Sequence, residues 1–356
     1  MNKKVLVGMS GGVDSSVCAY LLKRDGYEPT GANCRFFDND DAFITDKTCC
    51  SLEDANDARN VAYKLGIPFY VFNFTEEFRN CVIENFVETY RNAATPNPCI
   101  ECNRRLKFDK LLKRAIELDH DYVATGHYAR IEADPVSGRK LLKKGVDEKK
   151  DQSYVLYMLN QFQLTHTLFP LGGYTKAQIR QIAEEQGFLN AKKHESQDIC
   201  FIPDGDYASF IEKHTGRTFP KGDFVTEDGK VLGTHKGIIR YTVGQRRGLG
   251  LALPAPLYVK RKDPENNRVV LSPEKDLYTS DLDAENINLI VSEKLDAPLK
   301  VKARIRYNQP EQPATVTQTD EDRFHVHFDS PQRAIAKGQA VVLYDGDIVV
   351  GGGTII

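Results

Sequence analysis

The stretch "GMSGGVDSS", residues 8–16, lies between an apolar segment, "KKVLVGM" (3–9), and an apolar helical pattern, "SSVCAYLLKRDGY" (15–27). Its adjacent glycines, Gly11 and Gly12, allow the backbone to turn so that several N–H groups point inward. The start of the helix adds its positive end, and Ser10, Ser15 and Ser16 add hydroxyl donors. The stretch therefore predicts a phosphate-binding loop; the alternative is a glycine-rich turn that only joins strand to helix. It has neither the GK[ST] ending of a Walker A loop nor the G-x-G-x-x-G spacing of a dinucleotide fingerprint.

The chain around this loop alternates between strand and helix patterns up to about residue 130. Further strands are predicted at 27–36, 67–74 and 122–131, and further helices at 51–66, 75–92 and 106–121. This order is typical of an α/β fold with a doubly wound parallel sheet, in which ligands bind beyond the carboxyl ends of the strands. Residues 151–190 also have helical patterns.

The pattern changes after about residue 205. Glycines and short apolar runs up to residue 278 predict a small mixed domain, and the alternating segments that follow predict a compact antiparallel β-barrel. We therefore expect three domains: a catalytic domain at 1–205, a central domain at 206–278 and a C-terminal barrel at 279–356. In the barrel, alternating basic residues share one face of a predicted strand and suit contact with a nucleic-acid backbone: Lys300, Lys302, Arg304 and Arg306.

Composition limits the class of protein. The net charge is −2, so nucleic-acid binding must come from local basic patches. No apolar run is long enough to span a membrane, and the N-terminus does not have the pattern of a signal peptide. We expect a cytoplasmic protein without membrane contact, in which eight cysteines do not form a disulfide framework.

Three cysteines are candidates for chemistry. Cys99 and Cys102 lie in "TPNPCIECNRRLKF" (95–108), which is expected to be a loop with a helix starting after Cys102, where Arg104 and Arg105 would favour its thiolate. Cys200 lies in "HESQDICFIPDGDY" (194–207). A zinc site would need a fourth ligand, which His127 or His194 could supply. Persulfide chemistry is equally compatible with these residues, and buried structural thiols are a close alternative.

Several motifs in one order resemble known families. The loop S-G-G-x-D-S-S resembles that of the ATP pyrophosphatase (PP-loop) family, whose members split ATP between the α- and β-phosphates. The full set resembles the bacterial tRNA-specific 2-thiouridylase family (MnmA type), nearly from end to end. Its segments are "SGGVDSS" (10–16), "TPNP" with Cys102–Asn103 (95–103), "ATGHY" (124–128), "KDQSY" (150–154), "ICFI" (199–202), "GQRRGLGL" (244–251) and "RIRYNQ" (304–309).

The resemblance implies an ATP-dependent enzyme that thiolates the wobble uridine of tRNA. The 2-oxygen of the uridine would attack the α-phosphate of ATP, and Asp14 would help to hold Mg²⁺. Cys200 would carry a persulfide, Cys102 would act as the nucleophile, and the two would form a transient disulfide. The implied ATP-binding residues are Gly8, Met9, Ser10, Gly11, Gly12, Val13, Asp14, Ser15, Cys34 and Gly126.

The resemblance also implies RNA contacts and partners. The target base would meet Asn97, Pro98 and Cys99. The implied tRNA-binding residues are His127, Lys150, Asp151, Gln152, Arg306, Tyr307 and Gln339. The partners would be tRNAs for Lys, Glu and Gln, and a persulfide sulfur carrier or cysteine desulfurase.

One position departs from the family pattern. Position 99 is often aspartate in that family, whereas this chain has Cys99, which weakens a general-base role there. The resulting set of Cys99, Cys102 and Cys200 could instead hold a [4Fe-4S] cluster with one open iron. Two other classes are alternatives: a small-molecule PP-loop ligase, and a metal-bound RNA-binding module without ATP turnover.

Overall fold

The computed structural model describes residues 2–37, 52–193 and 199–356. Its first sheet has five parallel strands in the order β3-β2-β1-β4-β7, which confirms the predicted parallel sheet. The strands are β1 (Lys4–Gly8), β2 (Glu28–Arg35), β3 (Phe69–Asn73), β4 (Tyr122–Ala124) and β7 (Thr167–Leu168).

Helices cover both faces of this sheet because β1 buries alternate side chains on opposite sides. Val5 and Val7 pack in one core with helices α1 (Val13–Arg24), α2 (Leu52–Leu65) and α8 (Lys176–Glu185). Leu6 packs in a second core that includes α6 (Leu111–Glu117). The chain runs outward from β1 to β3 and then returns to the other side of β1 at β4, so the ligand crevice is expected at the ends of β1 and β4.

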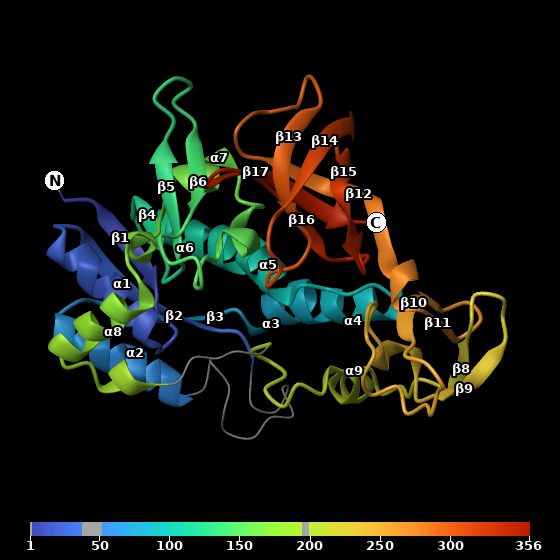
Figure 1. Ribbon diagram of the computed structural model, residues 1–356. Coiled ribbons are helices and arrows are strands. Elements are labelled where there is room, and N and C mark those ends of the chain that lie inside the picture. The colour runs from blue at the N-terminus through green and yellow to red at the C-terminus, as the bar shows by residue number, and fades with distance from the viewer. Residues whose placement is uncertain (1, 38–51, 194–198) are drawn as a thin grey trace.

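Two helical rods adjoin the sheet. The first consists of α3 (Thr75–Phe78), η1 (Arg79–Ile83) and α4 (Glu84–Arg91), and Figure 1 shows it running below the barrel toward the central domain. The second consists of α5 (Pro98–Cys102), η2 (Asn103–Lys110) and α6. The prediction that Cys99 and Cys102 lie in a loop is therefore wrong. Their helix begins at Pro98, because Asn97 caps it and Pro98 suits its first position.

The prediction of one strand at 122–131 is also wrong. Strand β4 ends at Ala124, and β5 (Ala129–Ala133) forms a hairpin with β6 (Lys140–Lys144) that leaves the parallel sheet. The hairpin extends the barrel sheet through the pairing of Lys143 with Ile348. Residues 151–190 are more broken than predicted, with η3 (Ser153–Leu156), α7 (Gln161–Thr165), η4 (Pro170–Gly173), α8 and η5 (Leu189–Lys192).

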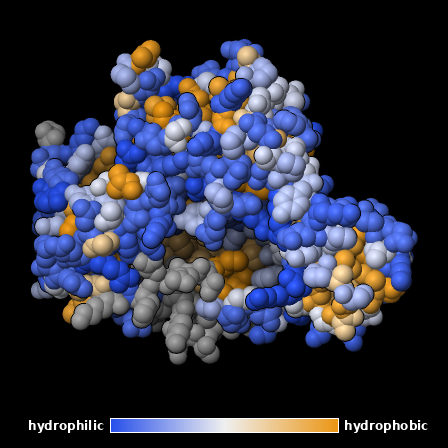
Figure 2. All heavy atoms as spheres, viewed as in Figure 1, coloured by the Kyte–Doolittle hydropathy of each residue, from blue (hydrophilic) through white to orange (hydrophobic). Residues whose placement is uncertain are grey.

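The central region contains a small mixed sheet in the order β10-β11-β8-β9, preceded by α9 (Tyr207–Thr215). Its strands are β8 (Gly222–Val225), β9 (Val231–His235), β10 (Tyr258–Asp263) and β11 (Arg268–Ser272). Short helices η6 (Ile238–Arg240) and η7 (Glu274–Leu277) flank it. Apolar residues gather on the surface of this region, at the lower right of Figure 2, whereas the rest of that face is largely hydrophilic.

The C-terminal strands form the predicted antiparallel barrel, which closes through the pairing of β12 with β17. The strands are β12 (Tyr278–Leu289), β13 (Leu299–Arg304), β14 (Gln312–Asp320), β15 (Arg323–Arg333), β16 (Ala340–Asp345) and β17 (Ile348–Ile355). Within the described ranges, no helix has the length and apolar character needed to cross a membrane.

Candidate active site

The phosphate loop is held tightly at the end of β1. The Met9 N–H donates to the carbonyl of Ala32 (2.7 Å), and Asn33 Nδ2 donates to the Met9 carbonyl (2.9 Å). Gly11 has a φ of +76°, and a Cβ there would lie 2.3 Å from the carbonyl oxygen of Asp54. The loop therefore requires glycine at position 11, both for its backbone conformation and for its contact with α2.

The start of α1 has the chemistry of an anion site. Its N-cap is Gly12, which has no side chain that could cap the first N–H groups. Ser15 Oγ accepts from the Ser10 N–H (3.2 Å) and donates to the Gly12 carbonyl (3.1 Å), which fixes the turn. The loop thus presents backbone donors at a helix N-terminus, as a phosphate requires.

Asp14 makes two contacts that the sequence did not predict. Lys176 Nζ lies 2.8 Å from each of its carboxylate oxygens, and the Tyr128 hydroxyl donates to its Oδ1 (2.7 Å). Thr175 and Gln178 form a capping box that places Lys176 at the start of α8, and their spacing in the sequence is typical of such a box. Nothing in the local sequence indicates that this helix start meets Asp14.

A second unpredicted residue supports the other side of the loop. Asn190 Nδ2 donates to the Gly11 carbonyl (2.8 Å) and to Ser16 Oγ (2.9 Å), and Asn190 is buried. The contact joins the segment after α8 to the phosphate loop, although 179 residues separate Asn190 from Gly11.

Gly126 lies against the same helix start. A Cβ at position 126 would lie 2.9 Å from the Asp14 carbonyl carbon and 3.0 Å from the Ser15 nitrogen. The resemblance implies that Gly126 binds ATP, but the contact that the structure describes is with the protein itself. Gly126 allows the β4–β5 connection to pack directly on the loop.

His127 is buried between the rings of Phe108 and Phe169, and its Nδ1 lies 2.7 Å from Thr125 Oγ1. Burial, assisted by the charge of Lys107, holds the pKa of His127 well below its ordinary value. The imidazole is therefore neutral near neutral pH, and its ring is enclosed by protein.

Cys34, which the resemblance assigns to ATP binding, lies near the end of β2 and packs against the core that includes Cys102. Burial raises the pKa of the Cys34 thiol to about 12, and the charge of Cys102 contributes to the increase. Lys107 acts in the opposite direction. Cys34 and Cys102 therefore lie within electrostatic reach of each other.

Cys99 and Cys102 both lie in α5. Cys99 is exposed and Cys102 is buried, with 9% of its surface accessible. Cys99 lies in the first turn of α5, at the positive end of the helix, whereas Cys102 is its last residue. Arg104 and Arg105, expected to support the Cys102 thiolate, each lie 3.7 Å from Glu101 in weak ion pairs, so part of their charge is compensated there.

Cys200 is half-buried and lies 98 residues after Cys102. Its neighbour Phe201 packs edge-on against Phe78 and Phe86 of the first rod, and that rod also packs against α5. The fold therefore brings the Cys200 segment and the α5 cysteines to one helical rod.

The sequence suggests a zinc site or an iron–sulfur cluster at these cysteines. Among residues 2–37, 52–193 and 199–356, no group of three His, Cys, Asp or Glu side chains is placed to hold a metal ion. The described positions of Cys99, Cys102 and Cys200 thus do not fit an iron–sulfur cluster or a zinc site. His194 lies outside the described residues, as do Cys49 and Cys50.

Three predicted tRNA contacts bond to protein carbonyls. Gln339 Nε2 donates to Thr95 (2.9 Å) and Pro96 (3.1 Å). An Arg306 NH2 group donates to the carbonyls of Val243 (3.2 Å) and Ala334 (2.8 Å). The hydroxyl of Tyr307 donates to the carbonyl of Asp151 (3.2 Å). These side chains hold domains together in the described structure.

The predicted contacts at 150–152 are similarly engaged. The buried carboxylate of Asp151 accepts from the Gly145 N–H (3.1 Å) and from Ser153 Oγ (2.8 Å). Gln152 Oε1 accepts from the Tyr128 N–H (3.0 Å), directly after His127. The role of these residues and of Lys150 in RNA binding stays a prediction.

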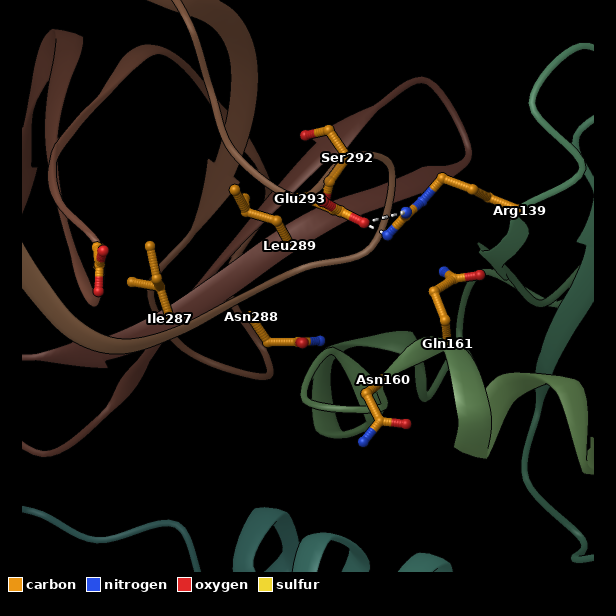
Figure 3. A pocket seen from close by; sticks show the side chains of 9 residues that line it. Arg139, Asn160, Gln161, Ile287, Asn288, Leu289, Ser292 and Glu293 are labelled. Atoms are coloured by element: carbon orange, nitrogen blue, oxygen red, sulfur yellow. Dashed lines mark hydrogen bonds and ion pairs between the residues drawn. The ribbon is translucent and has the colours of Figure 1, made fainter.

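A cavity of about 320 Å³ lies apart from these residues, between the β5–β6 hairpin, α7 and the barrel. Figure 3 shows Arg139 directed toward Glu293 across it, and Arg139 Nε donates to the Ile290 carbonyl (3.1 Å). Lys144 of the same basic hairpin pairs with Glu311 (2.7 Å). These basic residues therefore join the hairpin to the barrel.

Comparisons with known proteins cover the whole chain. Family models described as tRNA methyl transferase HUP domain, tRNA methyl transferase PRC-barrel domain and aminomethyltransferase beta-barrel domain match residues 3–204, 208–273 and 279–355. The chain is 51% identical to the tRNA-specific 2-thiouridylase MnmA of Clostridioides difficile, over 100% of this chain and 98% of the relative. It is 51% identical to the MnmA of Clostridium acetobutylicum over 100% of both chains. It is 52% identical to MnmA 2 of Caldanaerobacter subterraneus, over 99% of this chain and 98% of the relative. Because identity at this level extends over the full length of these relatives, the chain belongs to the family of tRNA-specific 2-thiouridylases.

Proposed function

We propose that this protein is an ATP-dependent sulfurtransferase that converts the 2-oxygen of the wobble uridine of tRNA to sulfur. The observation that carries the proposal is the identity of 51% to tRNA-specific 2-thiouridylases over the entire chain. The geometry supports it, because β2 contacts both parts of the site: Asn33 Nδ2 donates to the Met9 carbonyl of the loop (2.9 Å), and Cys34 packs against the core that includes Cys102. A small-molecule ligase would need the loop but not the cysteines.

Activation of the uridine is assigned to the loop at the end of β1. A carbonyl oxygen is a poor leaving group. When it attacks the α-phosphate of ATP, pyrophosphate is released and the oxygen becomes part of AMP, which is a good leaving group. The N–H groups at the start of α1 would bind the phosphates. Asp14, whose carboxylate contacts Lys176 Nζ in the described structure, would supply one oxygen ligand to Mg²⁺. Mg²⁺ usually completes its coordination shell with phosphate oxygens and water, and it would neutralise phosphate charge.

Sulfur transfer is assigned to Cys200 and Cys102. The terminal sulfur of a Cys200 persulfide attacks the 2-carbon of the adenylated uridine. The Cys102 thiolate then attacks Sγ of Cys200, the persulfide S–S bond breaks, and its electron pair stays with the sulfur on the base. AMP leaves with the former 2-oxygen. The products are 2-thiouridine and a Cys102–Cys200 disulfide, which a dithiol reductant reopens.

The partners follow from this chemistry. We propose tRNAs for Lys, Glu and Gln as substrates, and a persulfide carrier or cysteine desulfurase as the sulfur source. The target base is assigned to Asn97, Pro98 and Cys99 at the start of α5. The cytoplasm, where thiols are kept reduced, suits a cycle that ends in a disulfide.

The test is a thiouridine assay with ATP, tRNA and a persulfide donor. We expect 2-thiouridine in the tRNA and pyrophosphate release that requires tRNA. Cys200→Ser should still release pyrophosphate but form no thiouridine, because adenylation precedes sulfur transfer. Pyrophosphate release with a small acid or amine in place of tRNA would instead indicate a small-molecule ligase, and absence of ATP turnover would indicate an RNA-binding module.

A further inference from the structure

The segment Ala334–Gln339, which connects β15 to β16 in the barrel, contacts the chain just before the α5 cysteines. The Thr95 N–H donates to the Lys337 carbonyl (2.8 Å). Gln339 Nε2 donates to the carbonyls of Thr95 (2.9 Å) and Pro96 (3.1 Å). Three hydrogen bonds therefore fix the two residues that precede Asn97, the N-cap of the helix carrying Cys99 and Cys102.

Gly338 brings this segment close to the other chain. Its φ is +84°, and a Cβ there would lie 3.0 Å from the Thr95 carbonyl oxygen and 3.1 Å from both Ala94 Cβ and Thr89 Cγ2. These contacts are tighter than ordinary van der Waals distances. A side chain at position 338 would push the barrel segment away from Ala94 and Thr95.

The other end of the segment is anchored to the barrel and the central region. The Ala334 N–H donates to the Leu277 carbonyl (2.8 Å), and the Ala334 carbonyl accepts from Arg306 (2.8 Å). Arg306 also holds the Val243 carbonyl (3.2 Å). Hydrogen bonds therefore fix the Ala334 end of the segment, while its other end contacts Thr95 and Pro96.

The helix start depends on this support because one of its faces is not filled by packing. A cavity of about 220 Å³ borders the N-cap Asn97, Glu101 of α5, Arg104 of η2 and Gly338 on the segment. Side-chain packing is thus incomplete on this face of the helix, so the hydrogen bonds to Thr95 and Pro96 add to the Asn97 cap in holding the start of the helix in place.

We infer that the Ala334–Gln339 segment is a positioning element for sulfur transfer: it fixes the start of α5 and thereby the location of the Cys102 thiol. Gly338 and Gln339 are the positioning residues, and they act through the backbone of Thr95 and Pro96. The inference rests on the proposed function for its meaning in catalysis. The contacts themselves do not depend on that function.

The test compares Gly338→Ala and Gln339→Met with the wild type in the full-length protein. A matched control is Gly346→Ala, because Gly346 also has a positive φ (+59°) but no described atom lies within 4 Å of a Cβ built there. Three quantities are measured: the rate of alkylation of each cysteine by iodoacetamide, mapped by mass spectrometry; the Kd for tRNA; and kcat and KM for thiolation.

We expect both variants to change the alkylation rate of Cys102 about threefold to tenfold, the factor that loss of a hydrogen bond implies. Their kcat should fall about tenfold to a hundredfold, as small misplacements of reacting groups do, with Kd for tRNA nearly unchanged. Cys18, buried in the sheet domain, should stay unreactive, which excludes global unfolding. Gly346→Ala should match the wild type.

Other outcomes would overturn the inference. If Gln339→Met weakens tRNA binding and leaves Cys102 reactivity and kcat unchanged, Gln339 is a tRNA contact only. If neither variant changes any of the three quantities, the segment does not position α5. If Gly338→Ala fails to fold, Gln339→Met decides. A wild type that forms no thiouridine contradicts the proposed function, whereas the comparison of alkylation rates remains valid.

Discussion

Lys176 Nζ lies 2.8 Å from both carboxylate oxygens of Asp14, and this pair joins the first residue of α8 to the first turn of α1. The phosphate loop therefore contains a cation as well as backbone donors. Because the Tyr128 hydroxyl also donates to Asp14, the carboxylate is oriented from two sides. A triphosphate entering this loop would meet Lys176 and the helix N-terminus together.

The first prediction concerns this lysine. Lys176→Met should lower kcat/KM for ATP about tenfold to a hundredfold, since a hydrogen bond to a charged group contributes about 1.5–3 kcal/mol. Pyrophosphate release measured over a range of ATP concentrations tests this. Lys294→Met is the control, because Lys294 is an exposed barrel residue paired with Asp296 (2.8 Å). Equal kcat/KM values for Lys176→Met and the wild type would remove Lys176 from the ATP site.

Gly126 supports a second prediction. Gly126→Ala should weaken ATP binding about tenfold, because its Cβ would displace Asp14 and Ser15 from the start of α1, and small displacements are costly in such sites. Calorimetry with a non-hydrolysable ATP analogue measures the effect. Gly173→Ala is the matched control, since no described atom lies within 4 Å of a Cβ at that position. A Kd equal to that of the control would show that the loop tolerates the shift.

Local patterns in the sequence were sufficient for the main architecture. The apolar runs around "GMSGGVDSS" predicted the first strand, the loop and the first helix, and the alternation after residue 279 predicted the barrel. Both patterns are periodic and involve neighbouring residues, so they can be recognised in a single sequence. The pattern around Pro96 and Pro98 did not predict the start of α5, because prolines are also typical of loops, although Asn97 before Pro98 is a helix-start pattern.

Contacts between distant segments could not be predicted in this way. The strand pattern of 122–131 continues through Gly126, whereas β4 ends at Ala124 and Gly126 packs against Asp14, which lies far away in the sequence. The bonds of Asn190 to Gly11 and of Gln339 to Thr95 also depend on the tertiary fold. Several residues expected to bind tRNA form hydrogen bonds within the protein, and these bonds also depend on the tertiary fold.

A third prediction separates the roles of the cysteines. Cys102→Ser and Cys200→Ser should lower thiolation about a thousandfold or more, since each removes a sulfur that takes part in the reaction. Cys99→Ser should lower thiolation much less, about threefold to tenfold, because Cys99 is assigned to contact with the target base and not to sulfur transfer, and it forms no metal-binding group with described residues.

Anaerobic purification with iron and acid-labile sulfide analysis provides the independent check on Cys99. We expect an iron-free, colourless and active enzyme. Stoichiometric iron and sulfide that are lost in Cys99→Ser, together with lost activity, would establish the cluster route instead.

The last prediction uses the buried imidazole of His127. Its pKa in the folded protein lies well below the ordinary value, which is about 6.5 in the unfolded chain. Below that pH the unfolded chain binds more protons than the folded one, so the presence of His127 lowers the free energy of unfolding as the pH falls. Urea unfolding at about pH 7.5 and pH 5.5, on either side of the ordinary pKa, should show that the wild type loses more stability on acidification than His127→Gln does.

His325 on the barrel is the matched control with the opposite sign. Its pKa is raised, chiefly by the hydrogen bond to Asp283 (2.8 Å). Its contribution to the stability of the folded protein is therefore fully present below about pH 6.5 and is lost as the pH rises. His325→Gln should therefore lose more stability on acidification than the wild type, the reverse of His127→Gln. If the two variants respond in the same direction, the imidazole of His127 does not remain neutral inside the fold, and its enclosure by Phe108 and Phe169 does not control its protonation.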